Sequence, residues 1–486
     1  MIDVLSVASE AYPLVKTGGL ADVAGALPAA LAPYGVSMRT LIPGYPAVMR
    51  EAAAARVVYE FGDLYDGPAR LLAGRAAGLD LIILDAPHLY DRPGGPYLDA
   101  AGHDWPDNWR RFAALCWVAG KLSLGLVEGY QPQIVHAQDW TAGLAPAYVK
   151  YSPSDRVKTV MTIHNMVFQG HFGADIFGRL DLPPHAYYET VEYYGGVGYL
   201  KAGLAAADAV TTVSPTYARE IRTPAFGAGL DGLMNARATS LYGITNGIDI
   251  KAWDPAIDPT LTQNYASNTV HKREVNKRAV RERFGITGGD AMLFSVVSRL
   301  TGQKGIDLIA SNVDWLVSLG ATLVVLGSGD AVLESTLQAA AARHPGRVGV
   351  IRGYDEGLSH LIQGGADAIL IPSRFEPCGL TQLYGLRYGC VPVVARVGGL
   401  ADTVIDANEA AVDAGVATGL QFSPVTSEAL GEAIQRAIML YGREKDWRRI
   451  QRRGMKSDVS WDGSAKRYAD LYASLLGLER DDHYRD

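Results

Sequence analysis

Short apolar runs alternate with amphipathic stretches along almost the whole chain. The runs cover residues 4–8, 79–84, 133–137, 157–163 and 209–213 in the first half, and 291–297, 321–326, 348–351, 368–371 and 391–395 in the second. Runs of this length without polar alternation are typical of strands buried on both faces. Their alternation with helical stretches predicts parallel sheets with helices on both sides.

Helical periodicity fills the stretches between these runs. Leu20, Val23, Leu27 and Leu31 recur at the spacing of one helix face, and the same period returns over residues 426–440, 445–455 and 461–476. The chain has 486 residues, which is too long for one ordinary core. A turn signal at residues 246–249 divides the two series of strands. We therefore expect domains at residues 1–246 and 247–457, and a C-terminal helix within 458–486.

One glycine-rich motif occurs twice. Residues 16–22 read Lys-Thr-Gly-Gly-Leu-Ala-Asp, and residues 397–402 read Val-Gly-Gly-Leu-Ala-Asp. Each copy lies between a predicted strand and a predicted helix, where glycine allows a ligand close to the backbone and the helix N-terminus favours negative charge. Both loops are candidate phosphate or sugar binders. Two such loops predict an α/β fold with two Rossmann-like, doubly wound domains facing a central cleft.

Polar residues follow the predicted strands at the ends where such sheets bind ligands. In the first half these are Glu10, Lys16, Asp139, His164 and Asn165. In the second half they are Arg299, Lys304, Tyr354, Arg374 and Glu376, followed by Pro377-Cys378-Gly379-Leu380-Thr381. The mixture of cations and glycine loops suits a diphosphate-bearing substrate that is handled without an obligatory metal.

Composition limits the class of protein. The formal net charge of −7 argues against an extended nucleic-acid surface, and no apolar segment is long enough to span a bilayer. The three cysteines, Cys116, Cys378 and Cys390, fit no metal-binding spacing. With no leader before the first strand, we expect a soluble cytoplasmic protein with reduced thiols.

Five motifs together resemble the bacterial glycogen synthases and the related plastid starch synthases. They are Lys16 to Leu20, Thr162 to Asn165, Ile244 to Asp249, Ser298 to Gly305 and Glu376 to Gln382. The resemblance implies a GT-B glycosyltransferase that transfers glucose from ADP-glucose to the nonreducing end of an α-1,4-glucan, with retention of configuration. It also implies that the last helix, from about Trp461, crosses back to the first domain.

The resemblance assigns roles to residues of both halves. Glu376 is expected to hold glucose hydroxyls and favour the positively charged transition state, while Arg299 and Lys304 neutralise the leaving diphosphate. Lys16, with Gly18 and Gly19, would hold the donor's phosphates. His164 would lie against the transferred sugar. Further substrate contacts are expected from Asp139, Asn165, Asn246, Tyr354 (stacking on adenine), Cys378, Gly379, Leu380 and Thr381, with Glu10 and Tyr97 on the acceptor side.

Two other classes remain open from the sequence. A nucleotide-binding dehydrogenase would share the Rossmann-like sheets, but no Gly-x-Gly-x-x-Gly follows the first strand. A noncatalytic glucan-binding protein on a decayed transferase fold would require a lost active-site group, whereas Lys16, His164, Arg299, Lys304 and Glu376 are all present. The chain contains no Asp-x-Asp pair, so we expect neither a metal nor another cofactor.

Overall fold

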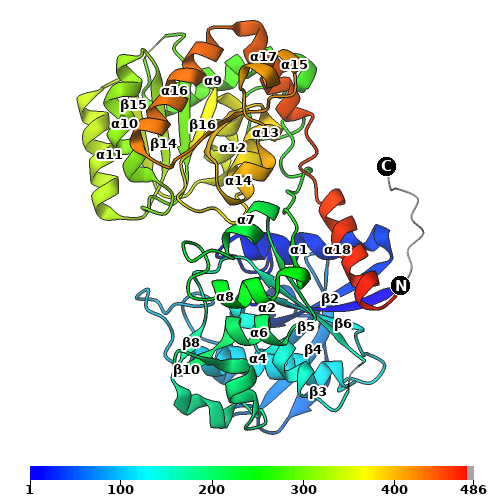
Figure 1. Ribbon diagram of the computed structural model, residues 1–486. Coiled ribbons are helices and arrows are strands. Elements are labelled where there is room, and N and C mark those ends of the chain that lie inside the picture. Colours follow the sequence, from blue (N-terminus) through cyan, green and yellow to red (C-terminus); the bar gives the residue numbers. More distant parts are fainter. Residues whose placement is uncertain (155, 288, 479–486) are drawn as a thin grey trace. The chain divides into compact units, whose positions relative to one another are not determined.

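The computed structural model describes residues 1–154, 156–287 and 289–478. The chain separates into two compact units (Figure 1). The first unit contains Met1–Asn246 together with the C-terminal stretch from Trp461, and the second contains Gly247–Ser460. The chain passes from the first unit to the second after Asn246. It returns to the first unit at Trp461, directly before α18 (Asp462–Leu475) and three residues beyond the expected 458.

The first unit is built on a nine-stranded sheet. Seven neighbouring strands are parallel, in the order β12-β11-β7-β6-β1-β2-β5, and β4 and β3 extend the edge antiparallel. Numbered along the chain, the parallel strands lie in the order 7-6-5-4-1-2-3, so the order reverses between β1 and β6. The strands are β1 Ile2–Val7, β2 Val36–Pro43, β3 Arg56–Phe61, β4 Ala69–Ala76, β5 Leu79–Asp85, β6 Ile134–Gln138, β7 Lys158–Ile163, β11 Ala209–Thr212 and β12 Leu241–Gly243.

The second unit has a six-stranded, fully parallel sheet. Its strand order is β15-β14-β13-β16-β17-β18, which is the 3-2-1-4-5-6 order of a doubly wound fold. The order reverses between β13 and β16. The strands are β13 Leu293–Val297, β14 Thr322–Gly327, β15 Val348–Arg352, β16 Ala368–Ile371, β17 Val391–Ala395 and β18 Leu420–Phe422.

Helices cover both faces of each sheet, as the apolar runs predict. In β1, Val4 packs in the same cluster as α1 and α18, whereas its neighbour Leu5 packs in the cluster of α4. In β13, Leu293 and Phe294 divide in the same way between two clusters. The first unit's helices are α1 Gly19–Leu31, α2 Pro46–Glu51, α3 Pro87–Tyr90, α4 Asn108–Ser123, α5 Ala145–Lys150, α6 Tyr199–Ala206, α7 Pro215–Glu220, α8 Asp231–Ala236 and α18.

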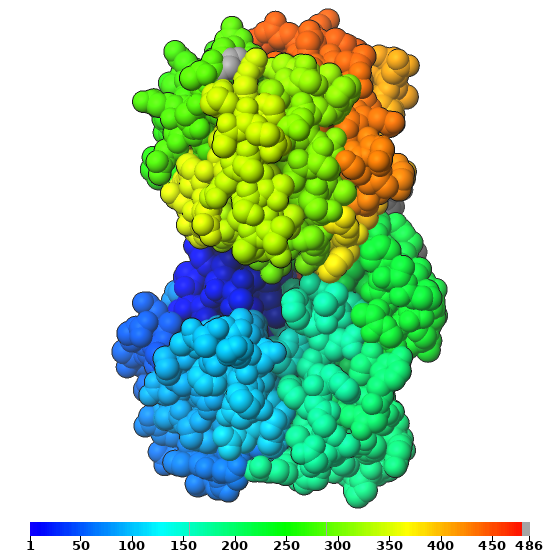
Figure 2. All heavy atoms as spheres, turned by 90° about the vertical axis from the view of Figure 1, so that its left-hand side faces the viewer, coloured from blue at the N-terminus to red at the C-terminus, as the bar shows by residue number. Residues whose placement is uncertain are grey.

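The second unit's helices are α9 Arg273–Phe284, α10 Ile306–Ser318, α11 Ala331–Arg343, α12 Glu356–Gly365, α13 Thr381–Tyr388, α14 Gly398–Thr403, α15 Glu409–Ala414, α16 Ser427–Tyr441 and α17 Glu444–Met455. A small sheet of β8 (His171–Phe172), β10 (Gly196–Gly198) and β9 (Glu192–Tyr193) completes the first unit. On the face in Figure 2, the first unit carries the blue-to-green part of the colour scale and the second the later colours. Among the described residues, none of the helices combines the length and apolar character that crossing a membrane requires.

The last helix belongs to the first unit. It lies beside α1 (Figure 1). Its side chains Tyr468 and Tyr472 are fully buried. The hydroxyl of Tyr472 is 2.7 Å from Nδ1 of the buried His136 on β6, and Tyr34 donates a hydrogen bond to Asp462 at 2.6 Å. The first unit therefore draws its core from both ends of the sequence.

Candidate active site

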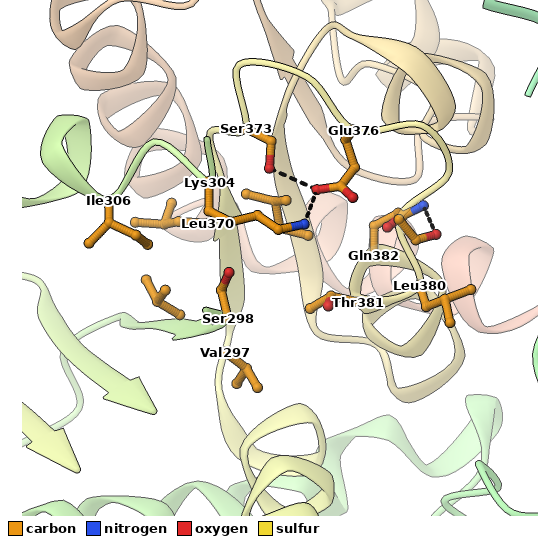
Figure 3. A pocket seen from close by; sticks show the side chains of 13 residues that line it. Val297, Ser298, Lys304, Ile306, Leu370, Ser373, Glu376, Leu380, Thr381 and Gln382 are labelled. Carbon is orange, nitrogen blue, oxygen red and sulfur yellow. Dashed lines mark hydrogen bonds and ion pairs between the residues drawn. The ribbon is translucent and has the colours of Figure 1, made fainter. Parts of the chain in front are cut away.

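The second unit places three polar side chains together at the point where its strand order reverses. Lys304 lies in the loop after β13, and Ser373 and Glu376 lie in the loop after β16. Nζ of Lys304 is 2.6 Å from Oε2 of Glu376, and the hydroxyl of Ser373 donates to the same oxygen at 2.9 Å (Figure 3). Glu376 is 7% exposed. Both contacts fall on Oε2, so among the described residues Oε1 is the carboxylate oxygen that a ligand can reach.

A cavity of about 50 Å³ lies beside this cluster (Figure 3). Its lining includes Ser298, Lys304 and Glu376, and also Gly379, Leu380, Thr381 and Gln382 around the start of α13. The unpaired N–H groups and the dipole of a helix N-terminus favour negative charge. The volume admits a few waters rather than a sugar nucleotide, so a substrate would enter it only in part.

The two loops that carry Lys304 and Glu376 are clamped together. The guanidinium of Arg374 forms two hydrogen bonds of 2.7 Å to the carboxylate of Asp307, at the start of α10, and a third of 2.6 Å to the carbonyl of Gly302. The N–H of Arg374 also donates to the carbonyl of Gln303 at 2.9 Å. Gly305 has a positive φ of 68°, and a Cβ there would lie 2.0 Å from the Pro372 carbonyl oxygen. This close contact explains the glycine after Lys304.

The second glycine pair packs against the Glu376 loop. A Cβ on Gly398 would lie 1.9 Å from the carbonyl oxygen of Glu376, and one on Gly399 would lie 2.1 Å from that of Cys378. The N–H of Gly399 donates to the Glu376 carbonyl at 3.1 Å. Gly398 and Gly399 are buried, so their glycine character serves this close backbone approach. Cys378 is buried as well, and its carbonyl accepts a hydrogen bond from Gln382 at 3.0 Å.

Two predicted donor residues are exposed on the same unit. Arg299 follows β13 and is exposed, while Tyr354 follows β15 and is 77% exposed. An exposed tyrosine ring after a strand end is accessible for stacking on a flat base. The role of each residue stays a prediction.

The first unit presents the other glycine loop in an open state. Gly18 precedes α1 and Gly19 begins it, and a Cβ on either would meet no atom within 4 Å. The exposed Lys16 pairs with Asp22 at 2.7 Å. The two copies of the motif therefore differ in what surrounds them: the first has space for a ligand at its glycines, and the second is filled by the chain itself.

A buried carboxylate lies behind the first loop. One oxygen of Glu10 accepts hydrogen bonds from the N–H groups of Thr17 and Gly18, and the other accepts from the hydroxyl of Tyr97 at 2.6 Å. Burial raises the pKa of Glu10, although these hydrogen bonds lower it. Ser9, 2.9 Å from the Tyr97 hydroxyl, extends the network. Glu10 and Tyr97, both predicted on the acceptor side, thus form one cluster that shapes the Lys16 loop.

Asp139 organises the loops after β6 and β7. Its Oδ2 accepts from the N–H groups of His164 at 3.1 Å and Asn165 at 3.2 Å, and Oδ1 accepts from Trp140 at 2.7 Å. Asp139 has φ 61° and ψ −175°, a backbone region that only glycine adopts without strain. Burial raises the pKa of Asp139 to about 7. Strain of this kind persists where surrounding contacts hold it, and it is concentrated at functional sites.

His164 is neutral near pH 7. Loss of solvent lowers the pKa of its imidazole to about 3, and its Nε2 is 2.8 Å from Oε1 of Gln138. Asn246, the last residue of the first unit, is 7% exposed, and its side-chain oxygen has no hydrogen-bond partner in the described part of the chain. A buried acceptor of this kind can be satisfied by water or by a bound molecule.

The structure gathers most of the predicted residues into one group on each unit, whereas Arg299 and Tyr354 do not line the cavity beside Glu376 and Asn246 lies at the end of the first unit's main segment. Lys16, Gly18, Gly19 and Glu10 lie after β1, and Asp139, His164 and Asn165 lie after the neighbouring β6 and β7. Tyr97, from the segment between α3 and α4, joins them through its hydrogen bond to Glu10. Lys304, Glu376 and residues 378–381 share the second unit's reversal point. Sequence reasoning did not single out Ser373 or Gln138, although both flank strand ends where such residues are expected. In the described ranges, no three His, Cys, Asp or Glu side chains gather as a metal site would require.

Two doubly wound units, each with its polar loops at the reversal of strand order, are the architecture of the GT-B fold. Sequence models of two families match the chain: "starch synthase catalytic domain" over residues 3–236 and "glycosyl transferases group 1" over residues 276–454. The chain belongs to the glycogen and starch synthase family of glucosyltransferases.

Relatives named glycogen synthase match along the full length. That of Mesorhizobium japonicum is 60% identical, covering 98% of this chain and 99% of the relative. That of Novosphingobium aromaticivorans is 58% identical, covering 99% and 100%. Among solved structures, the catalytic domain of starch synthase IV from Arabidopsis thaliana, bound to ADP and acarbose, has a TM-score of 0.87 at 30% identity and covers 98% of this chain and 99% of its own.

A second solved structure shares the fold alone. The sucrose-phosphate synthase of Thermosynechococcus elongatus has a TM-score of 0.59 at 16% identity, covering 98% of this chain and 100% of its own. The family match excludes the dehydrogenase alternative that the Rossmann-like sheets left open.

Proposed function

We propose that this enzyme transfers glucose from ADP-glucose to the 4-hydroxyl at the nonreducing end of an α-1,4-glucan, with retention of configuration and without a metal. The observation that carries the proposal is the Lys304–Glu376 pair at the second unit's reversal point, beside the start of α13. The ADP and acarbose bound to the Arabidopsis starch synthase support the choice of nucleotide and glucan.

The charge distribution of the second unit suits departure of a diphosphate. Breaking the bond between glucose and diphosphate leaves negative charge on the leaving oxygen, which Lys304, Arg299 and the α13 N-terminus would stabilise. Oε1 of Glu376 would accept hydrogen bonds from glucose hydroxyls, and its charge would favour the oxocarbenium-like transition state. The fixed cations take the part that a metal plays in other transferases.

The first unit would supply the remaining contacts. Lys16 and the open Gly18–Gly19 backbone would hold donor phosphates, and the neutral His164 would face the transferred sugar. The Glu10–Tyr97 cluster would lie on the acceptor side. We place the reaction in the cytoplasm, consistent with three buried cysteines that form no disulfide in the described part of the chain.

Incorporation of labelled glucose into glycogen tests the proposal directly. We expect faster transfer from ADP-glucose than from UDP-glucose, with full activity retained in excess EDTA after bound metal has been removed. Equal or faster transfer from UDP-glucose would contradict the donor. Inactivation by EDTA that magnesium or manganese restores would show that an ion supplies the charge assigned to Arg299 and Lys304.

A further inference from the structure

A second cavity lies in the first unit, among residues to which the proposed reaction gives no role. It has a volume of about 300 Å³ and is lined by α7, the strand β12 and α18. Three arginines contribute to its wall: Arg219 and Arg222 from α7 and the turn after it, and Arg467 from α18. None of its lining residues is acidic.

Each of the three guanidinium groups is held by a neutral acceptor. Arg219 donates to the Thr216 hydroxyl at 2.8 Å, Arg222 to the side-chain oxygen of Asn235 at 3.1 Å, and Arg467 to the carbonyl of Gly243 at 2.7 Å. Within the described ranges, none of the three forms an ion pair. The three arginines, all exposed, are therefore oriented by hydrogen bonds to neutral groups.

In a wider cavity of the second unit, by contrast, two of the cations that line the wall form ion pairs. That cavity, about 470 Å³ between α9 and α17, also contains Lys277 and Arg448. There Lys277 is paired with Asp367 at 2.8 Å, and Arg448 is paired with Glu444. The α7–β12–α18 cavity differs from this second cavity, because its cations line a wall that contains no carboxylate.

The wall between the arginines suits a small polar molecule. β12 is the outermost strand of the sheet and, among the described strands, pairs with β11 alone, so one backbone edge faces away from the sheet. Tyr242, 41% exposed, adds a ring and hydroxyl that can contact a sugar. A volume of 300 Å³ is at the small end of ligand sites, the size of a monosaccharide phosphate.

From this geometry we propose that the α7–β12–α18 cavity is a binding site for a small phosphate-bearing metabolite of sugar-phosphate size, separate from the donor site. Arginine presents a planar fork of donors that matches phosphate oxygens, and three arginines that line one cavity would neutralise a dianion bound there. A formal net charge of −7 disfavours the alternative of a long nucleic acid, whose affinity depends on extended positive surface.

Calorimetric titration of the full-length enzyme tests this site. Saturating ADP is added first, to occupy the proposed donor site, and glucose 6-phosphate or inorganic phosphate is then titrated at constant ionic strength. We expect one saturable site, with an affinity at least tenfold weaker in the Arg219→Gln/Arg222→Gln double variant. Arg283→Gln, an exposed arginine on α9, is the matched control and should bind as the wild type does.

The conservative variant Arg467→Lys keeps the charge but not the fork, and should weaken binding by a smaller factor than Arg467→Gln. Thermal unfolding of each variant checks that it folds. Equal binding by wild type and the double variant, or no saturable binding by wild type, would overturn the proposal. So would a single-stranded oligonucleotide that binds through these arginines when neither small phosphate does.

Discussion

Glu376 illustrates how far single residues can be understood here. Its carboxylate is buried, and two of its contacts, from Lys304 and Ser373, fall on one oxygen, so its position is fixed before any substrate binds. A preorganised group of this kind acts on the transition state without reorganising. Its proposed partner is the sugar, not the nucleotide.

Replacement of Glu376 by Ala should therefore separate turnover from nucleotide binding. We expect kcat to fall by about two to three decades, the loss usual when one such contact is removed, with little change in ADP affinity. Steady-state kinetics and ADP titration measure the two effects. Glu432→Ala, on an exposed face of α16, is the control and should leave both unchanged. Near-normal turnover would remove Glu376 from the mechanism.

Asp139 allows a prediction about pH. The pKa of about 7 in the folded state lies above the ordinary value of 3.8, so the folded protein holds this proton more tightly than the unfolded chain. Its contribution to stability is complete below pH 3.8 and is lost as the pH rises through 7. Between pH 3.8 and pH 7, the free energy of unfolding of the wild type should therefore fall by up to about 4 kcal/mol relative to that of Asp139→Asn.

The difference in pH dependence between the wild type and Asp139→Asn isolates this carboxyl group, because the two proteins share every other titratable group. Hydrogen exchange of amides in β6 and β7 at pH 5 and pH 8 measures the effect locally. Parallel pH dependence in the two proteins would show that Asp139 titrates as an ordinary carboxylate.

The site residues that the sequence marks most clearly are charged, whereas the two that were missed are neutral. Lys304 and Glu376 carry charge directly after buried strands, so both composition and position mark them. Ser373 and Gln138 act by holding a neighbour, and a serine or glutamine near a strand end is too common to stand out. Nothing in the sequence reveals the positive φ of Asp139, since aspartate there reads as an ordinary cap.

At the scale of elements, the loop after β17 is a support for the loop after β16. Gly399 lies in α14, where a Cβ would be 2.1 Å from the Cys378 carbonyl oxygen, and its φ is not in the left-handed region. A side chain at this position is excluded by space alone. The support fixes the main chain on either side of Cys378 and thereby the Glu376 carboxylate.

Gly399→Ala should therefore displace the Glu376 loop and lower kcat at least tenfold. Gly232→Ala is a matched control, since Gly232 also lies in a helix, α8, but a Cβ there meets no atom within 4 Å. We expect it to have wild-type activity. Comparison of the kcat values of the two variants, measured with ADP-glucose and glycogen, tests this prediction. Equal activity of the two variants would mean that the loop yields without moving Glu376.

Strands could be predicted from the sequence where both faces of the sheet are buried by helices. The structure confirms the strands predicted from the largely apolar runs at residues 4–8, 291–297, 321–326 and 391–395, which are β1, β13, β14 and β17. β2 was not singled out because Ser37 and Arg39 interrupt its apolar sequence. β3 and β4 were missed because they form an antiparallel pair at the sheet edge, where exposed residues break the pattern.

At the scale of the whole molecule, the chain enters the second unit after Asn246 and returns to the first at Trp461. The two connecting segments meet within the second unit, where the N–H of Ile248 donates to the Val459 carbonyl at 2.8 Å. The boundary could be predicted from the gap between two series of strands. The three-residue difference at the return reflects that helix starts are poorly marked in sequence.

Truncation after Ser460 should unfold the first unit and spare the second. Trp461, Tyr468 and Tyr472 are each at most 7% exposed, and burying one large side chain contributes about 1.5–3 kcal/mol. Their loss, together with an exposed sheet face, approaches the whole stability of a domain. Calorimetry should show one cooperative transition in the truncated chain. Two unchanged transitions would mean that α18 is dispensable.

The interrupted order of the first unit has a consequence for its biosynthesis. A ribosome adds about 5–20 residues per second, so roughly 200 residues of the second unit occupy it for about 10–40 s before α18 emerges. During that time Val4, Ile134 and Val160 of the nascent first unit have the helix α1 beside them but lack the contacts of α18. The second unit, although later in sequence, can finish folding first. In any expression host, the apolar face awaiting α18 is the surface at which chaperones and aggregation compete.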